Sequence, residues 1–223
     1  MNGLPANFKT SLDSKYEQSF LERYPEVAIR TIIRESKQMI EGWRSFNEFS
    51  HLLTKVCPIK FENPALMYKI IGKIGKGGYG TIFRVERHTD KKNFALKFTN
   101  PRSNAERQDV INECSLISFL DCEQLIKCEE VYDFQNRLWV FIELMEGGDL
   151  TNIVLNRRGD FSEDFCKFSL YQVALGLQSM HSRNILHRDI KSDNILCRPN
   201  GDVKIADLGF SVFLTEQQQY RKT

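Results

Sequence analysis

One short stretch of the chain combines the residue types that transfer of a phosphoryl group requires. It begins with His187 and Arg188 and contains Asp189, Lys191 and Asn194. A carboxylate can accept the proton of a hydroxyl group, an ammonium group can neutralise a phosphate, and an amide oxygen can bind Mg²⁺. A single Asp in a loop is commonly a turn former. The combination in one short interval is far more specific, so it favours phosphoryl-transfer chemistry.

A second acidic motif, Asp207-Leu208-Gly209, follows the first along the chain. Its simpler interpretation is a turn that uses Asp and Gly for their backbone preferences. Its functional interpretation is a second hard oxygen ligand for Mg²⁺, in addition to Asn194.

A glycine-rich segment contains Gly75, Gly77 and Gly80 in the pattern G-x-G-x-x-G. Alone, this pattern is weak evidence, because a plain glycine-rich hairpin has the same composition. A dinucleotide-binding fold needs a helix directly after the glycines, but residues 81–85 have the pattern of a strand. A glycine turn between two strands is instead the arrangement that lays a flexible backbone over phosphates.

A lysine and a glutamate complete the set of charged candidates. Lys97 lies on an expected strand and Glu113 on an expected helix. Each residue alone is usually a solvated surface residue. Together with the glycine segment, however, they predict an ion pair that aims the lysine at phosphates.

The elements that must hold these residues follow from hydrophobic periodicity. Strand patterns occupy residues 68–74, 81–85, 93–98, 126–132, 138–143, 195–196 and 203–205. Helix patterns occupy residues 105–120 and 165–180, and the chain between them turns helical after Gly148. A strand-rich first half followed by a helical half predicts an α+β protein and not a doubly wound sheet.

The region before residue 68 has a different character. Residues 1–24 are polar and rich in turn-forming residues, and from Pro25 apolar residues recur at helical spacing as far as Trp43. Pro58 and Pro64 then mark a connector. We therefore expect an N-terminal, regulatory-like extension over 1–66 that contains this amphipathic helix, and a separate domain over 68–223. The helix would either cover an exposed apolar surface of that domain and inhibit it in cis, or pack on it as a plain scaffold.

At this point the chain resembles the protein kinase superfamily. The order of glycine loop, strand lysine, helix glutamate, His-Arg-Asp-x-x-x-x-Asn and Asp-x-Gly agrees with its signature. Lys191, two residues after Asp189, is typical of the serine/threonine class. Residues 139–150, 187–196 and 208–211 together resemble the PAK group of sterile-twenty-like kinases, which small GTPases activate. Residues 3–11 and 24–28 weakly resemble the segment after that group's GTPase-binding motif.

The resemblance implies an ATP- and Mg²⁺-dependent enzyme that phosphorylates Ser and Thr in proteins. Its fold would be bilobal, with a small lobe of antiparallel strands and one helix at about 68–145. The large lobe, at about 146–223, would be helical. It would be C-terminally incomplete, because the family's Ala-Pro-Glu motif does not occur before Thr223. A truncated module that binds nucleotide or a partner without efficient catalysis is the alternative, and so is a fragment of a longer kinase.

The resemblance also implies roles for individual residues. The phosphates of ATP would be covered by Gly75, Gly77 and Gly80 and held by Lys97, which Glu113 braces. The adenine would contact Ile74, Ile82, Ala95, Ile142 and Leu196, and backbone groups of Glu143 and Met145. These apolar side chains are equally suited to a core, and the two interpretations are compatible.

In the catalytic stretch, the resemblance makes Asp189 the acceptor of the substrate proton and Lys191 the partner of the γ-phosphate. Asn194 and Asp207 would bind Mg²⁺. Thr223 aligns with an activation-loop phosphothreonine, and Arg188 would pair with that phosphate. Leu208 stands where Phe is usual, and its apolar side chain should preserve the motif. The resemblance implies a small-GTPase pathway, but the family's GTPase-binding core motif does not occur, so direct control by a small GTPase is not expected.

Composition excludes several other classes. Hydrophobic residues make up 41% and charged residues 27%, which is the balance of a globular protein. A net charge of +2 gives no indication of a nucleic-acid partner. We expect no membrane span and no secretory signal. The six cysteines form no CxxC pair, so reduced thiols in a cytoplasmic protein are expected.

Overall fold

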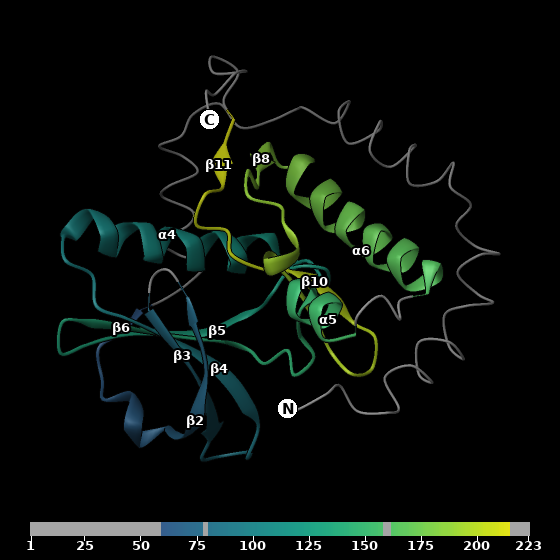
Figure 1. Ribbon diagram of the computed structural model, residues 1–223. Coiled ribbons are helices and arrows are strands. Elements are labelled where there is room, and N and C mark those ends of the chain that lie inside the picture. Colours follow the sequence, from purple (N-terminus) through teal and green to yellow (C-terminus); the bar gives the residue numbers. More distant parts are fainter. Residues whose placement is uncertain (1–58, 78–79, 158–161, 215–223) are drawn as a thin grey trace. The chain divides into compact units, whose positions relative to one another are not determined.

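The computed structural model of the chain describes residues 59–77, 80–157 and 162–214. These residues form two compact units, whose elements are labelled in Figure 1. The sheet unit holds the described residues up to Asp121 together with Ile126–Leu144. The helical unit holds Cys122–Leu125 and the described residues from Met145 onward. The helix expected between Pro25 and Trp43 lies outside the described residues, as does Thr223.

The sheet unit is built on one six-stranded sheet in the order β1-β5-β6-β4-β3-β2. Its strands are β1 (Ile59–Lys60), β2 (Tyr68–Gly77), β3 (Gly80–Arg87), β4 (Asn93–Thr99), β5 (Cys128–Phe134) and β6 (Arg137–Glu143). The pairs among β2 to β6 are antiparallel, as predicted, and β1 pairs with β5 in parallel. A short 3-10 helix, η1 (Pro64–Leu66), lies between β1 and β2.

Local sequence explains the hairpin between β5 and β6. Gln135 and Asn136, the two residues between these strands, have positive φ angles of 51° and 60°. Two consecutive left-handed residues match the twist of a two-residue hairpin, and Asn tolerates this conformation well. The turn fixes Phe134 opposite Arg137 and therefore sets the register of both strands.

One helix, α4 (Asn104–Leu120), belongs to the sheet unit and lies against one face of the sheet (Figure 1). Its start is capped, because the Ser103 hydroxyl accepts a hydrogen bond from the backbone N–H of Glu106. Buried Val110 and Cys114 of α4 pack with residues of β5 and β6. The other face of the sheet carries an aromatic core that includes Tyr68, Tyr132 and Phe141.

The helical unit contains two α-helices and short strands. They are β7 (Gly148–Asp149), α5 (Leu150–Arg157), α6 (Glu163–His181), β8 (Ile185–Leu186), the 3-10 helix η2 (Ser192–Asn194), β9 (Ile195–Cys197), β10 (Val203–Ile205) and β11 (Val212–Phe213). The strands form two small sheets, ordered β10-β9-β7 and β11-β8. Helix α6 lies so close to β10 that a Cβ atom added at Gly176 would be 2.8 Å from Ile205 Cδ1.

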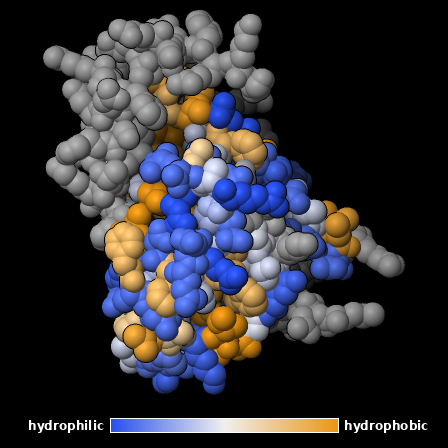
Figure 2. Space-filling view, turned by 90° about the vertical axis from the view of Figure 1, so that its left-hand side faces the viewer, coloured by the Kyte–Doolittle hydropathy of each residue, from blue (hydrophilic) through white to orange (hydrophobic). Residues whose placement is uncertain are grey.

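Much of the face shown in Figure 2 is hydrophilic. On the face shown in Figure 2, hydrophobic residues occur in several separate groups among hydrophilic residues. None of the helices in the described part of the chain is long and apolar enough to cross a membrane.

The order of elements agrees with the α+β organisation expected from periodicity. The helix expected over 105–120 is α4, and the one expected over 165–180 is α6. The segment between Pro58 and Pro64 differs from the expected connector, since Ile59 and Lys60 form a strand there.

Candidate functional site

In the sheet unit, Lys97 and Glu113 form the ion pair that the sequence predicts. Lys97 Nζ lies 2.9 and 3.0 Å from the two carboxylate oxygens of Glu113. Only 18% of the Lys97 side chain and 9% of the Glu113 side chain are exposed, so the pair is largely shielded from water. Shielding strengthens the attraction between the charges and fixes the direction of the ammonium group.

The sheet register brings several predicted nucleotide-binding residues to one face. Lys97 stands opposite Ile82 of β3, and Ala95 stands opposite Ile142 of β6. Directly opposed residues lie on the same face of a sheet, and so do residues two apart on one strand. Ile82, Ala95, Lys97 and Ile142 therefore share the face that α4 occupies.

The predicted apolar residues differ in burial. Ala95 is buried, whereas Ile74 is 51% exposed on β2. A purely structural core role therefore does not explain Ile74. Leu196, on β9 of the helical unit, is half-buried and stands opposite Lys204 and Asp149.

The glycines of the G-x-G-x-x-G segment lie on the hairpin of β2 and β3, with Gly77 opposite Gly80. A Cβ atom on Gly80 would lie 2.1 Å from the backbone oxygen of Phe98, which is far inside van der Waals contact. A Cβ atom on Gly75 would be 3.8 Å from Ile82, an ordinary contact. The fold itself therefore requires glycine at Gly80 but not at Gly75.

Glu143 and Met145 lie on either side of the division between the two units. The Glu143 amide donates a hydrogen bond to the carbonyl of Lys127 at 3.0 Å, and its carboxylate accepts one from the Lys127 amide at 2.6 Å. The carbonyl of buried Met145 accepts from the Gly148 amide at 3.1 Å. These bonds hold the backbone of both residues in place.

In the helical unit, the structure brings Asp189, Lys191 and Asn194 together. Lys191 Nζ lies 2.7 Å from Asp189 Oδ2, and Asn194 Nδ2 donates to the same oxygen at 3.0 Å. Asn194 Nδ2 also donates to the Asp189 carbonyl at 2.8 Å. The hydrogen bond from Lys191 is the largest cause of a lowered pKa for Asp189, and Asn194 acts in the same direction. Asp189 is therefore an ionised carboxylate at neutral pH.

His187 has a positioning role that the sequence did not reveal. Its side chain is buried, its Nδ1 accepts a hydrogen bond from the Asp189 amide at 3.3 Å, and its Nε2 lies 3.2 Å from the Ala206 carbonyl. Burial lowers the pKa of His187, so the ring is neutral. A neutral imidazole with an accepting Nδ1 donates through Nε2. His187 thus connects the backbone at Asp189 to the backbone just before Asp207.

Asp207 is fixed by its backbone. Its φ angle is 61°, and the Gly209 amide lies 3.4 Å from its carboxylate. The preceding amide, that of Ala206, donates to the Asn194 carbonyl at 2.8 Å. Leu208, the residue that departs from the usual Phe, is 2% exposed and serves as a core side chain. The two predicted oxygen ligands, Asn194 and Asp207, are therefore coupled through adjacent backbone.

The donor set suits a cation that also binds phosphate. No group of three or more His, Cys, Asp or Glu side chains in the described ranges is arranged to hold a metal ion. One carboxylate and one amide oxygen are nevertheless suitable ligands for Mg²⁺, which is usually held by one or two carboxylates together with substrate phosphates. The Nδ2 of Asn194 donates to Asp189, so its amide oxygen is the atom suited to a cation.

Two further contacts hold residues 187–194. The Thr151 hydroxyl on α5 lies 2.6 Å from the Ser192 hydroxyl, a contact for which the sequence has no signal. Arg188, predicted to bind a phosphate, has a φ angle of 66° and donates from Nε to the Phe210 carbonyl at 2.7 Å. Its predicted partner Thr223 lies outside the described residues.

Comparison with protein families and with known proteins gives matches that cover most of the chain. The model of the protein kinase domain family matches residues 68–223. The chain is 29% identical over 229 residues to the serine/threonine-protein kinase pakA of Dictyostelium discoideum, covering 99% of this chain and 19% of that protein. It is 32% identical over 177 residues to the serine/threonine-protein kinase STE20 of Kluyveromyces lactis, covering 77% of this chain and 17% of that protein.

A solved structure shows the same fold. The twitchin kinase region of Caenorhabditis elegans matches with a TM-score of 0.67 at 28% identity, covering 73% of this chain and 29% of that one. The chain spans about a fifth of the length of the first two curated relatives, since it covers 19% and 20% of them.

Proposed function

Because the chain belongs to the protein kinase domain family, we propose that it transfers the γ-phosphoryl group of ATP to serine and threonine hydroxyls of proteins. The resemblance to PAK-like kinases is confirmed by relatives such as pakA and STE20. The bilobal α+β fold is confirmed by the match to the twitchin kinase. The observation that carries the proposal is the ionised Asp189, held by Lys191 and Asn194.

In the sheet unit, Lys97 would bind the α- and β-phosphates of ATP, and Glu113 would orient the ammonium group of Lys97. Gly75, Gly77 and Gly80 would cover the phosphates. The adenine would contact the apolar side chains at positions 74, 82, 95, 142 and 196 and the backbone at 143 and 145.

In the helical unit, Asp189 would accept the proton of the substrate hydroxyl as its oxygen attacks the γ-phosphorus and ADP leaves. Lys191 would neutralise charge on the γ-phosphate. His187 would hold the backbone of Asp189 at a fixed distance from the backbone that carries Asp207.

The family implies ATP as substrate and, typically, a divalent cation. Mg²⁺ is the ion that Asn194 and Asp207 suit, and when bound with ATP it would neutralise the phosphate oxygens. We also propose that the protein acts on protein substrates in PAK-like signalling in the cytoplasm, and that Arg188 pairs with a phosphate on Thr223. Its place in a small-GTPase pathway would not depend on direct GTPase binding.

The test uses the 223-residue chain with Mg²⁺, γ-labelled ATP and peptide libraries that contain Ser, Thr or Tyr as the single acceptor. We expect label in the Ser and Thr libraries. Asp189→Asn should abolish transfer and preserve ATP binding, because it removes the proton acceptor and retains the shape. Asp202→Asn, a matched change between β9 and β10, should leave transfer unchanged.

The same assay distinguishes a kinase from a module that binds nucleotide without efficient catalysis. ATP binding without transfer to any library would support a nucleotide-binding module, which the kinase relatives do not favour. Transfer that persists at full rate in Asp189→Asn would remove the proposed role of that carboxylate.

A further inference from the structure

The strand β1 precedes the matched kinase region, yet it belongs to the same sheet. Ile59 stands beside Val131 and Lys60 beside Tyr132, whereas the match to the family begins at residue 68. Without β1, strand β5 would be an edge of the sheet, with unpaired backbone groups. The segment before the domain therefore completes its sheet.

Ile59 begins a row of directly opposed residues that crosses the sheet to the lysine of the ion pair. Ile59 is beside Val131, Val131 is opposite Val140, and Val140 is opposite Lys97. Opposed residues lie on the same face of a sheet. Ile59 and Lys97 therefore lie on one face, separated only by two valines.

The same face seats helix α4. Val110 and Cys114 of α4 form a buried cluster with Val131 and Val140, and Ile59 packs against this cluster. Glu113 directly precedes Cys114, and Lys97 is the cross-strand neighbour of Val140. Each partner of the ion pair is thus next to a member of the cluster that Ile59 contacts.

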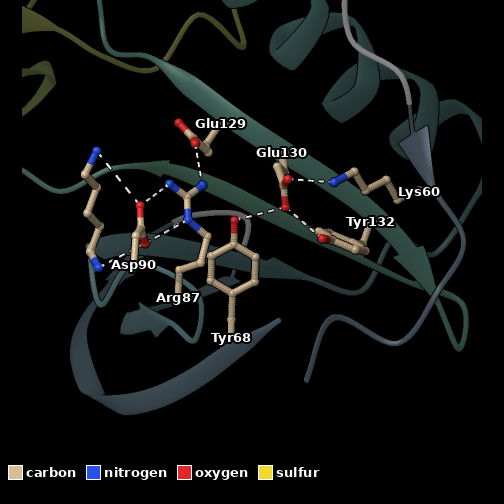
Figure 3. A network of polar contacts seen from close by, with 8 residues as sticks. Lys60, Tyr68, Arg87, Asp90, Glu129, Glu130 and Tyr132 are labelled. Carbon is tan, nitrogen blue, oxygen red and sulfur yellow. Dashed lines mark hydrogen bonds and ion pairs between the residues drawn. The ribbon is translucent and has the colours of Figure 1, made fainter. Parts of the chain in front are cut away.

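On the other face, Lys60 is held by a polar network, shown in Figure 3. Its Nζ donates to Glu130 at 2.6 Å, and the hydroxyls of Tyr132 and Tyr68 donate to the other Glu130 oxygen at 2.7 and 2.9 Å. Burial alone would raise the pKa of Glu130, but these three hydrogen bonds together lower it, so the carboxylate is ionised. Lys60 therefore anchors β1 to β5 independently of Ile59.

Strand β5 also has an anchor that does not involve β1. Arg87, at the end of β3, lies 2.6 Å from Glu129 and 2.7 Å from Asp90 (Figure 3). Substitutions in β1 should therefore leave β5 in the sheet and change only what β1 itself supports.

We propose that β1 is a positioning strand for the nucleotide site: Ile59 supports α4 through the cluster, and α4 holds Glu113 on Lys97. The strand thereby couples the chain before the kinase region to the residues that bind the phosphates of ATP. The coupling to ATP rests on the proposed function, whereas the support of α4 does not.

The test compares four forms of the 223-residue chain: the parent, Ile59→Ala, Ile59→Val and Phe61→Ala. Phe61 is the matched control, because it lies just beyond β1 and is 75% exposed. Affinities for ATP and for adenosine are measured by calorimetry, since adenosine lacks the phosphates that Lys97 would bind. Amide hydrogen exchange is measured along α4 and along β2 and β3.

We expect Ile59→Ala to weaken ATP binding about three- to tenfold relative to adenosine binding. Exchange should rise in α4 and remain at the parent level in β2 and β3. Ile59→Val should give a smaller change in the same direction, and it carries the test if the Ala variant does not fold. Phe61→Ala should match the parent.

The proposal is overturned if α4 exchanges equally fast in the Ile59 variants and in Phe61→Ala, or if exchange rises equally across the whole sheet. It is also overturned if ATP and adenosine affinities fall by the same factor. If the parent chain binds no ATP, the proposed function fails, and exchange in α4 alone decides on the positioning strand.

Discussion

Replacement of Gly80 by Ala should destabilise the sheet unit, whether or not a nucleotide is present. The new Cβ atom would lie 2.1 Å from the Phe98 backbone oxygen and 3.5 Å from Thr99 Cα. Backbone on a central strand cannot move aside as a flexible side chain can. Gly80 also has a φ angle of 156°, which side chains rarely adopt. Forced contacts of this kind cost about 1–3 kcal/mol or more.

Strain at a sparsely populated backbone angle that suits glycine adds about 1–3 kcal/mol. We therefore expect a loss of about 2–6 kcal/mol, which corresponds to a Tm lower by roughly 4–24 °C for a chain of this size. Gly75→Ala is the matched control, because its Cβ atom would be 3.8 Å from Ile82. That change should alter Tm by less than about 4 °C.

Trp139 supplies a local probe of this prediction. Trp139 stands opposite Phe98, and the centroids of the two rings are 4.7 Å apart. Only Trp43 would interfere, and Trp43→Phe removes it from the background. Fluorescence of Trp139 is then followed during thermal unfolding of both glycine variants. Equal melting temperatures for Gly80→Ala and Gly75→Ala would refute the steric argument.

The charged and titratable residues determine ligand binding and the pH dependence of stability. Lys97→Met removes the ammonium group 2.9 Å from Glu113, and should weaken ATP binding about 10- to 100-fold with adenosine binding retained; calorimetry that shows equal losses for both ligands would contradict it. Burial lowers the pKa values of His187 and His181 below 6.5. The unfolded chain therefore takes up protons first, and the free energy of unfolding should fall as pH drops below about 6.5. Urea titrations from pH 7.5 to 5.5 should show that fall, and His187→Gln should reduce it; an unchanged slope in the variant would count against the assignment. Lys60→Met should raise the pKa of Glu130, because Glu130 loses its hydrogen bond from Lys60. Carbon NMR of the Glu130 carboxyl group measures this pKa. Because the Lys60 side chain is 38% exposed, the accompanying loss of stability should be only about 0.2–1 kcal/mol; no rise in the Glu130 pKa would exclude the anchoring role of Lys60.

The charged candidates could be predicted because their types and order are specific. The order of the motifs predicts both the pairing of Lys97 with Glu113 and the grouping of Asp189, Lys191 and Asn194. Helix α4 was also predicted within one residue, since Val110, Cys114 and Leu120 mark its buried side clearly. Periodicity succeeds here because the helix is long and has one buried face.

Strand β1 could not be predicted by the same reasoning. Two residues are too few to show an alternation, and the nearby prolines favour a connector. Its partners Val131 and Tyr132 are distant in sequence, and local patterns carry no information about such pairing. His187 was missed for a related reason, because its role depends on a hydrogen bond to Ala206 that only the fold creates.

The two groups of candidate residues are held in different ways, and this difference determines where regulation can act. Asp189 is fixed by residues near it in the sequence, because its amide donates to His187 and Asn194 donates to its carbonyl and carboxylate oxygens. Lys97 and Glu113 come from separate elements, whose relative position depends on the packing of α4 against the sheet. A change outside residues 187–194 should therefore move Asp189 little. A shift of α4 should change the distance between Lys97 and Glu113. Since Ile59 of β1 packs against the cluster that seats α4, the chain before the kinase region can act on the distance between Lys97 and Glu113.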